Sequence, residues 1–156
     1  MTGRLSFLAA ALWWGSLTTV GLLVVPMLFA HLPTPATAGT MAAKLFAAQT
    51  WVSVCCALLL LLLSRPKGAV ALYPWAQAAM LFIVGGMLLA LVSQYGVAPR
   101  IVARQDLRFW HTVGSVLYGL QWVCALVVLL KMRLLGAVSH DSAALPSGSP
   151  DDPADV

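Results

Sequence analysis

The hydrophobic positions along the chain fall into four long blocks, separated by short connections that contain polar residues or proline. The blocks cover about residues 5–30, 45–63, 73–98 and 112–130. A helix needs roughly 20 mostly apolar residues to cross the hydrocarbon core of a bilayer, and each block meets that requirement. Strands of a membrane β-barrel alternate hydrophobic and polar residues, whereas residues 58–63 are all leucine. The pattern therefore predicts four transmembrane helices.

Short connections favour consecutive helices that lie side by side in opposite directions. We therefore expect an all-α fold, an integral membrane four-helix bundle with antiparallel neighbouring helices, formed as one domain by residues 1–133. Residues 134–156 are rich in Ser, Pro, Gly, Ala and Asp and have no apolar periodicity, which is typical of a disordered C-terminal tail. Pro26, near the end of the first span, is expected to kink that helix.

A short motif occurs once in each half of the chain. Residues 26–31 read PMLFAH and residues 99–104 read PRIVAR, so both follow the pattern P-x-[LI]-[FV]-A-[HR]. The two copies run in the same direction through the predicted membrane, which would relate the halves by an axis along the membrane normal. The motif indicates either an internal duplication or a coincidence in a chain rich in Ala, Leu and Val.

The composition excludes a water-soluble domain. Of the 156 residues 61% are hydrophobic and only 9% are charged, and the mean hydropathy is +0.91, whereas soluble domains carry about 25% charged residues. The net charge of +4 comes from basic residues between the apolar blocks, so the expected partner is the lipid bilayer and not nucleic acid. The sequence has no Glu, no Gly-rich phosphate loop and no nucleophile–base motif, and we expect a non-enzymatic protein.

The basic residues also predict an orientation. Four spans place both termini on one side of the membrane, and cytoplasmic loops carry more Lys and Arg than the opposite loops. The terminal side carries Arg4, Arg65, Lys67, Lys131 and Arg133, and the other side carries Lys44, Arg100, Arg104 and Arg108. This bias of five to four favours cytoplasmic termini, and we expect a multi-pass protein of a bacterial inner membrane. Because four helices form a narrow bundle, a homo-oligomer is an alternative to a monomer.

Polar residues concentrate at the end of the bundle formed by the first and third connections. The residues Arg100, Arg104, Arg108, His111, Ser115 and Tyr118 are spaced by three or four positions, which places them on one face of a helix that begins near Pro99. We predict that this polar end binds a small ligand, a lipid or a partner. In the alternative interpretation, the arginines form a juxtamembrane turn that contacts lipid headgroups.

Two histidines suggest a metal site as an alternative function. His31 ends the first span, His111 begins the fourth, and Met27 lies one helical turn before His31. Imidazole and thioether ligands together suit copper, and two imidazoles could instead bind haem iron. The sequence lacks C-x-x-C-H and H-x-x-x-H motifs, so the other interpretation is that each histidine lies at the interface and bonds to backbone or headgroups.

Four glutamines lie within three of the four apolar blocks. We expect these residues to make interhelical hydrogen bonds, as polar side chains in transmembrane helices commonly do. They are Gln49, Gln77, Gln94 and Gln121.

Several strings of the sequence resemble a known family. In the first half these are residues 22–33 (LLVVPMLFAHLP), Gly39, residues 44–46 (KLF) and Cys55; in the second half they are residues 99–100 (PR) and 109–115 (FWHTVGS). Together they resemble a bacterial domain-of-unknown-function family of four-helix membrane proteins, which is similar to the eukaryotic transmembrane protein 205-like proteins. Thr112 stands where that family's pattern has glycine after the histidine.

The resemblance covers about residues 5–130 and implies a four-helix architecture, a membrane location and an undefined biochemical role. The eukaryotic relatives are linked to resistance to metal-containing drugs, and the chain also has a looser likeness to copper-resistance membrane proteins. Neither likeness supplies a mechanism.

Overall fold

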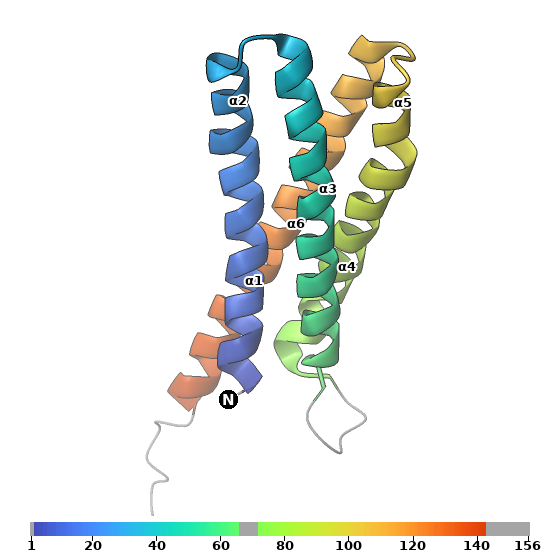
Figure 1. The fold of residues 1–156 in the computed structure, drawn as a ribbon. Helices are drawn as coiled ribbons and strands as arrows, with labels where there is room; N and C mark the ends of the chain where they lie inside the picture. The colour runs from blue at the N-terminus through green and yellow to red at the C-terminus, as the bar shows by residue number, and fades with distance from the viewer. Residues whose placement is uncertain (1, 66–71, 143–156) are drawn as a thin grey trace, which may run out of the picture.

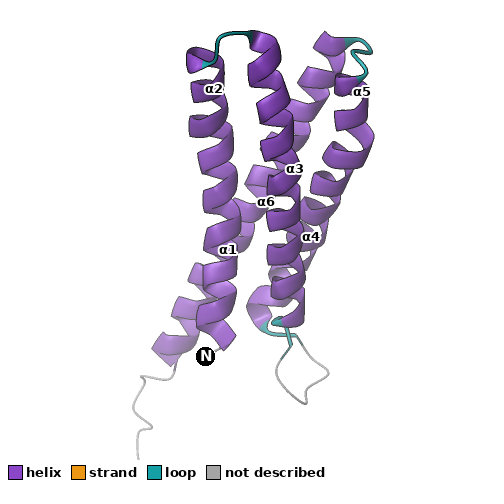
Figure 2. Cartoon of the chain, viewed as in Figure 1, coloured by secondary structure: helices purple, strands orange, loops and turns teal. Residues whose placement is uncertain are grey.

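The computed structural model describes residues 2–65 and 72–142, and these form four long rods of helix (Figure 1). No strand occurs in the described part of the chain (Figure 2). The first rod consists of α1 (Thr2–Thr18), the π-helix η1 (Thr19–Val24) and α2 (Val25–His31). The second rod is α3 (Pro35–Leu62). The third consists of α4 (Pro74–Leu91), the π-helix η2 (Val92–Val97) and α5 (Ala98–Val102), and the fourth is α6 (Leu107–Ser142).

All four rods are long and apolar enough to cross a membrane. The stretches that meet this criterion are Gly3–His31, Pro35–Leu62, Trp75–Val102 and Leu107–Leu134. Consecutive rods run in opposite directions, so the ends of α2 and α5 lie at one end of the bundle and the N-terminus at the other (Figure 1). The predicted all-α, four-helix membrane fold is therefore confirmed. We call the end that carries the α2–α3 and α5–α6 connections the loop end.

Two helix boundaries differ from those expected. The second helix begins at Pro35 and not near residue 45, because Thr34 caps it: the Thr34 Oγ1 accepts a hydrogen bond from the Thr37 N–H at 3.2 Å. At the other end of the chain, α6 continues to Ser142, so residues 134–142 are helical. A helix that has already formed extends at low cost, and no proline interrupts this stretch. The rest of the expected tail, residues 143–156, lies outside the described residues.

The two proline motifs share a backbone distortion. The π-helix η1 ends two residues before Pro26, and η2 ends two residues before Pro99. Proline has no N–H and its ring displaces the carbonyl one turn earlier, so a wider turn accommodates it. The kink expected at Pro26 therefore takes the form of a π-helical turn. The same turn in the third rod is what an internal duplication predicts.

The bundle is packed most tightly in the half that carries the termini. Trp13, Leu60, Ile83 and Val128 are fully buried there. The helices α1, α3, α4 and α6 form a ring in which each contacts two neighbours. A Cβ added to Gly86 would lie 2.8 Å from the Trp13 ring, so this glycine leaves the space that the ring of Trp13 fills between α1 and α4. The candidate functional site lies in the opposite half, toward the loop end.

Candidate functional site

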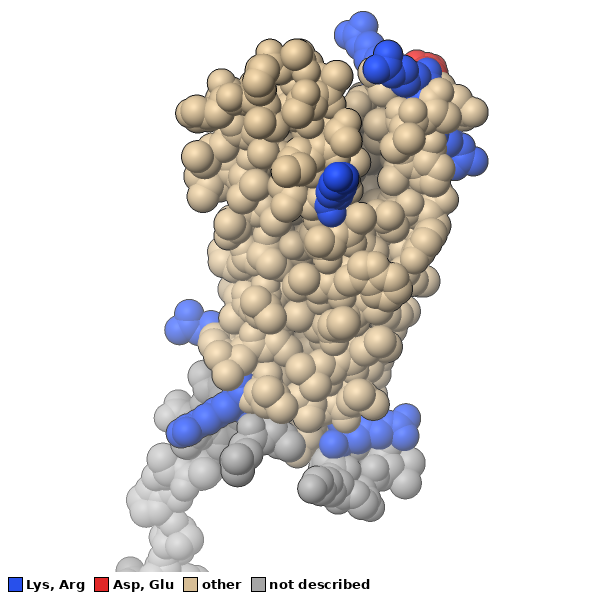
Figure 3. Space-filling view, viewed as in Figure 1, with Lys and Arg blue, Asp and Glu red and all other residues tan. Residues whose placement is uncertain are grey.

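A cavity of about 660 Å³ lies between the four rods toward the loop end. Figure 3 shows the surface hollowed there, between the part formed by α2 and α3 and the part formed by α5. The cavity exists because small residues face it from η1, α3 and α6: Gly21, Gly39, Ala42, Ala43, Gly114 and Gly119. Its volume falls in the range of about 300–1,000 Å³ that is common for small-molecule sites.

The floor of the cavity is a buried polar cluster that joins three helices. Gln49 of α3 and Gln121 of α6 border the cavity and are nearly fully buried. The Gln121 Nε2 donates to the Ser53 Oγ at 2.8 Å, and the Gln49 Nε2 donates to the Ser16 Oγ of α1 at 2.9 Å. These bonds confirm the predicted interhelical hydrogen bonds for Gln49 and Gln121, whereas those expected of Gln77 and Gln94 stay a prediction.

One wall of the cavity is built around Tyr118 of α6. Its hydroxyl donates to the Leu17 carbonyl oxygen at 2.8 Å. In a regular α-helix that carbonyl would accept from the N–H of residue 21, four positions later. Residues 19–24 form the π-helical turn η1 instead, so the bond from Tyr118 accompanies the distortion of the first rod.

The ring of Tyr118 occupies space that is free only because residue 21, in η1, is a glycine. A Cβ added to Gly21 would lie 2.7 Å from the Tyr118 Cε1. The ring packs edge-on against Phe46 of α3, with 5.3 Å between the centroids. Beside it, the Trp122 Nε1 donates to the Thr18 Oγ1 at 2.8 Å. This wall is therefore held in place by bonds to α1 and by aromatic packing against α3.

The opposite wall carries a buried hydroxyl without a partner. Ser93 lies in η2 and borders the cavity, and its Oγ is buried with no hydrogen-bond partner among the described residues. An unsatisfied hydroxyl in an apolar environment costs free energy. The cavity is the place from which a partner for Ser93 can come.

The sequence matches the family described as "Domain of unknown function (DUF4149)" over residues 8–109. The chain belongs to this family. No curated protein and no solved structure matches it. The region matched in this DUF4149 protein contains both π-helices, Gln49 and Ser93, whereas Tyr118 and Gln121 lie after its end.

The polar residues predicted along one helical face of this DUF4149 protein divide into two groups. His111, Ser115 and Tyr118 border the cavity. The arginines at positions 100, 104 and 108 are exposed and do not. The expected single face is wrong, because α5 ends at Val102 and α6 begins only at Leu107. A role for Arg100, Arg104 and Arg108 in binding at the polar end stays a prediction.

Arg100 is held against the protein surface. Its guanidinium carbon lies 4.6 Å from the centre of the Trp110 ring, and Nη1 donates to the Gly96 carbonyl. The turn that follows contains Arg104 and Asp106 with positive φ angles of 53° and 33°. These contacts place a basic, aromatic surface at the loop end of the bundle, as a headgroup-facing turn would.

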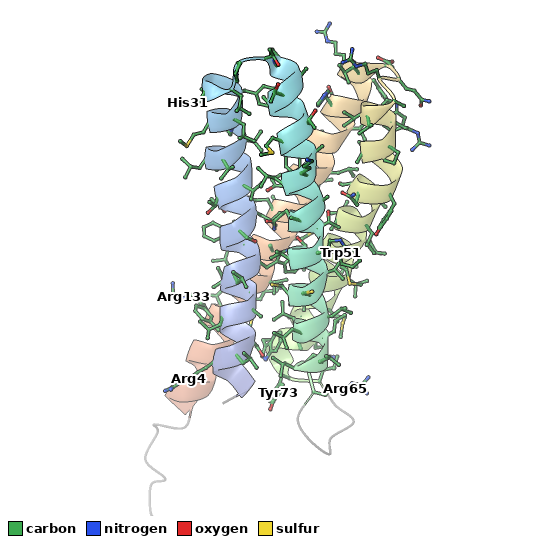
Figure 4. The ribbon with its side chains drawn as sticks, viewed as in Figure 1. Arg4, His31, Trp51, Arg65, Tyr73 and Arg133 are labelled. Carbon is green, nitrogen blue, oxygen red and sulfur yellow. The ribbon has the colours of Figure 1, made fainter. Side chains whose placement is uncertain are left out.

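The two predicted metal-ligand histidines lie at the same end of the bundle but on different sides of it. His31 ends α2 (Figure 4), which packs against α3. His111 lies near the start of α6, which packs against α5. The His31 Nδ1 bonds to the Met27 carbonyl at 3.0 Å and must donate, because a carbonyl only accepts. Of His31, His111 and Met27, only His111 borders the cavity. Within the described residues no group of three or more His, Cys, Asp or Glu could hold a metal, and the copper or haem hypothesis stays a prediction.

The sequence analysis named Phe46 only as part of the family resemblance, and it did not identify Ser93 or the cavity. One signal was available in the sequence. Residues 46–49 (FAAQ) in the second rod and residues 118–121 (YGLQ) in the fourth rod share the pattern aromatic-x-x-Gln. The two aromatic rings touch, and an amide from each copy lies at the cavity floor. This repeated pattern identifies Phe46, Gln49, Tyr118 and Gln121, and all four border the cavity.

Proposed function

We propose that this DUF4149 protein binds a lipid-soluble small molecule in the cavity between its four rods. The observation that carries this proposal is the cavity itself, which every rod borders and which combines mostly apolar lining with a few hydrogen-bonding side chains. That combination is typical of ligand sites, in which the apolar surface supplies affinity and the polar groups set orientation. Protein interiors are otherwise close-packed, with few voids larger than a water molecule.

The polar groups are also placed as a binding site needs them. Tyr118 and Trp122 are fixed by bonds to α1, and the glutamines are fixed by the serines beneath them. A site whose side chains are already held loses little conformational entropy when a ligand enters. This pre-organisation supports a specific ligand over loosely filling acyl chains.

The proposal includes a membrane setting. We place the protein in a bacterial inner membrane with cytoplasmic termini, and we propose kinship with the transmembrane protein 205-like proteins. The bias of basic residues toward the terminal side supports the orientation. The loop end would then face away from the cytoplasm, and the arginines there would contact headgroups.

A cavity-filling variant tests the proposal. Gly119 borders the cavity, and a Cβ added to it meets no atom within 4 Å, so a phenylalanine there would project into open space. Gly85 of α4 is the matched control, because its added Cβ also meets nothing while the residue does not border the cavity. Wild type, Gly119→Phe and Gly85→Phe would be purified from the same membranes, and their co-purified lipophilic molecules identified by mass spectrometry.

We expect at least one molecule that is abundant with wild type and with Gly85→Phe and strongly depleted with Gly119→Phe. Equal thermal stability of the two variants would show that the depletion does not come from unfolding. An identical set of molecules in all three preparations would contradict the proposal.

A further inference from the structure

The chemistry of the cavity floor identifies the kind of molecule that fits it. We infer that the ligand is an uncharged long-chain alcohol, whose hydroxyl group donates a hydrogen bond to the side-chain oxygen of Gln121, beside that of Gln49. This inference rests on the proposed function, and it adds the head group of the ligand and the atoms that recognise it.

The serines determine which way each glutamine amide faces. The Ser53 Oγ donates its hydrogen to the Gln49 backbone carbonyl at 2.9 Å, and the Ser16 Oγ donates to the Trp13 carbonyl at 3.0 Å. Each hydroxyl has one hydrogen, so toward the amides both serines can only accept. Both amides must therefore direct Nε2 at the serines.

That orientation leaves the amide oxygens for the cavity. No hydrogen bond between described residues ends on the Oε1 of Gln49 or Gln121, while both side chains border the cavity. Neither oxygen is among the fully enclosed polar atoms that lack a partner, so both are open to the cavity. Two carbonyl-type oxygens at the closed end of an apolar cavity select a ligand that brings a hydrogen-bond donor.

The other residues that border the cavity indicate that the hydrogen-bond donor of the ligand is a hydroxyl group. Apart from His111, the described residues that border the cavity carry no ionisable side chain other than a tyrosine, Tyr118, whose hydroxyl is already bonded. A charged head group would be buried without a counter-charge, which is costly. Ser93 adds a second buried group that can donate or accept. A hydroxyl both donates and accepts, so it suits the glutamines and the serine, whereas an ammonium group accepts nothing.

A pair of photoreactive probes tests this inference. The protein would be reconstituted in phosphatidylcholine nanodiscs, because that lipid has no hydroxyl. One probe is a diazirine-bearing octadecanol and the other is its methyl ether, which keeps the chain but cannot donate. Labelling is measured by mass spectrometry at increasing probe concentration, with unlabelled octadecanol as competitor. Gln121→Met removes the acceptor at similar volume, and Gln77→Met, at an exposed glutamine of α4 outside the cavity, is the matched control.

We expect saturable labelling of cavity residues by the alcohol, with an apparent affinity about fivefold higher than that of the ether, as one neutral hydrogen bond provides. We expect Gln121→Met to abolish this preference and Gln77→Met to keep it. If Gln121→Met does not fold, the comparison of the two probes on the wild-type chain decides alone.

The failures of the two proposals can be told apart. Saturable labelling by alcohol and ether with equal affinity would overturn the alcohol head group, with water then satisfying the glutamines, and would leave the cavity as a ligand site. Labelling that does not saturate with either probe would overturn both proposals.

Discussion

Replacing Ser53 with alanine perturbs the most buried polar contact of the fold. Ser53 is fully buried, and its Oγ accepts from the Gln121 Nε2 at 2.8 Å and from the Gln49 Nε2 at 3.5 Å. Without the hydroxyl, the Gln121 amide loses its partner. Gln49 keeps its shorter bond to Ser16 at 2.9 Å. The change therefore orphans one buried amide and leaves the other satisfied.

The cost follows from this difference. Leaving a buried polar group unsatisfied costs about 1–3 kcal/mol, whereas interhelical hydrogen bonds in membranes contribute about 0.6 kcal/mol on average and at most about 1.7 kcal/mol. Because Gln121 borders a cavity that water can enter, the cost is at the lower end. We expect Ser53→Ala to lower the free energy of unfolding by about 1.5 kcal/mol.

The assay is reversible unfolding of the purified protein in mixed micelles, followed by circular dichroism. Ser115→Ala is the control, because Ser115 is exposed and its hydroxyl donates only to the His111 carbonyl of its own helix. We expect that variant to unfold with nearly the wild-type free energy. If Ser53→Ala were as stable as Ser115→Ala, the cavity floor would not be the bonded cluster described above.

Three other predictions concern packing, orientation and metal. Gly86→Ala should lower the free energy of unfolding by about 1–3 kcal/mol, because the added Cβ would lie 2.8 Å from the buried Trp13 ring; in the same assay Gly85→Ala, with open space around its Cβ, should be nearly neutral, and equal stabilities would refute the packing. A reporter that works only in the cytoplasm, fused after Val156, should be active; activity solely from a periplasmic reporter would reverse the orientation. Elemental analysis and absorption spectra of wild type, His31→Ala and His111→Ala test the metal hypothesis, which requires copper or haem that both substitutions remove; metal-free wild type after copper and haem supplementation would end it.

The fold could be predicted because it depends on local signals. Apolar blocks of transmembrane length and short connections determine four antiparallel helices whatever their detailed packing. The break between α5 and α6 was missed because residues 103–106 (ARQD) contain neither Gly nor Pro, although Arg104 and Asp106 adopt positive φ angles there. The early start of α3 was missed because its first turns are too polar to count as an apolar block.

The cavity could not be predicted from the sequence, because a glycine in a helix can either admit a neighbouring side chain or leave the space beside it empty. Gly86 allows the Trp13 ring to fill the space beside it, whereas Gly119 faces open space. In a sequence both are glycines within an apolar helix. What separates them is the distance between helices at that depth, which depends on side chains from all four rods. His111, Ser115 and Tyr118 were predicted from their spacing. That spacing holds because all three lie within α6, on the face that borders the cavity.

The most direct test of the central claim is a cryo-EM map of the protein in lipid nanodiscs, bound to an antibody fragment for alignment. The account predicts an open cavity beside Tyr118 and Gln121 that contains non-protein density, with that density absent from a map of Gly119→Phe. Helices closed against one another at this depth, or a cavity with the same density in both maps, would contradict it.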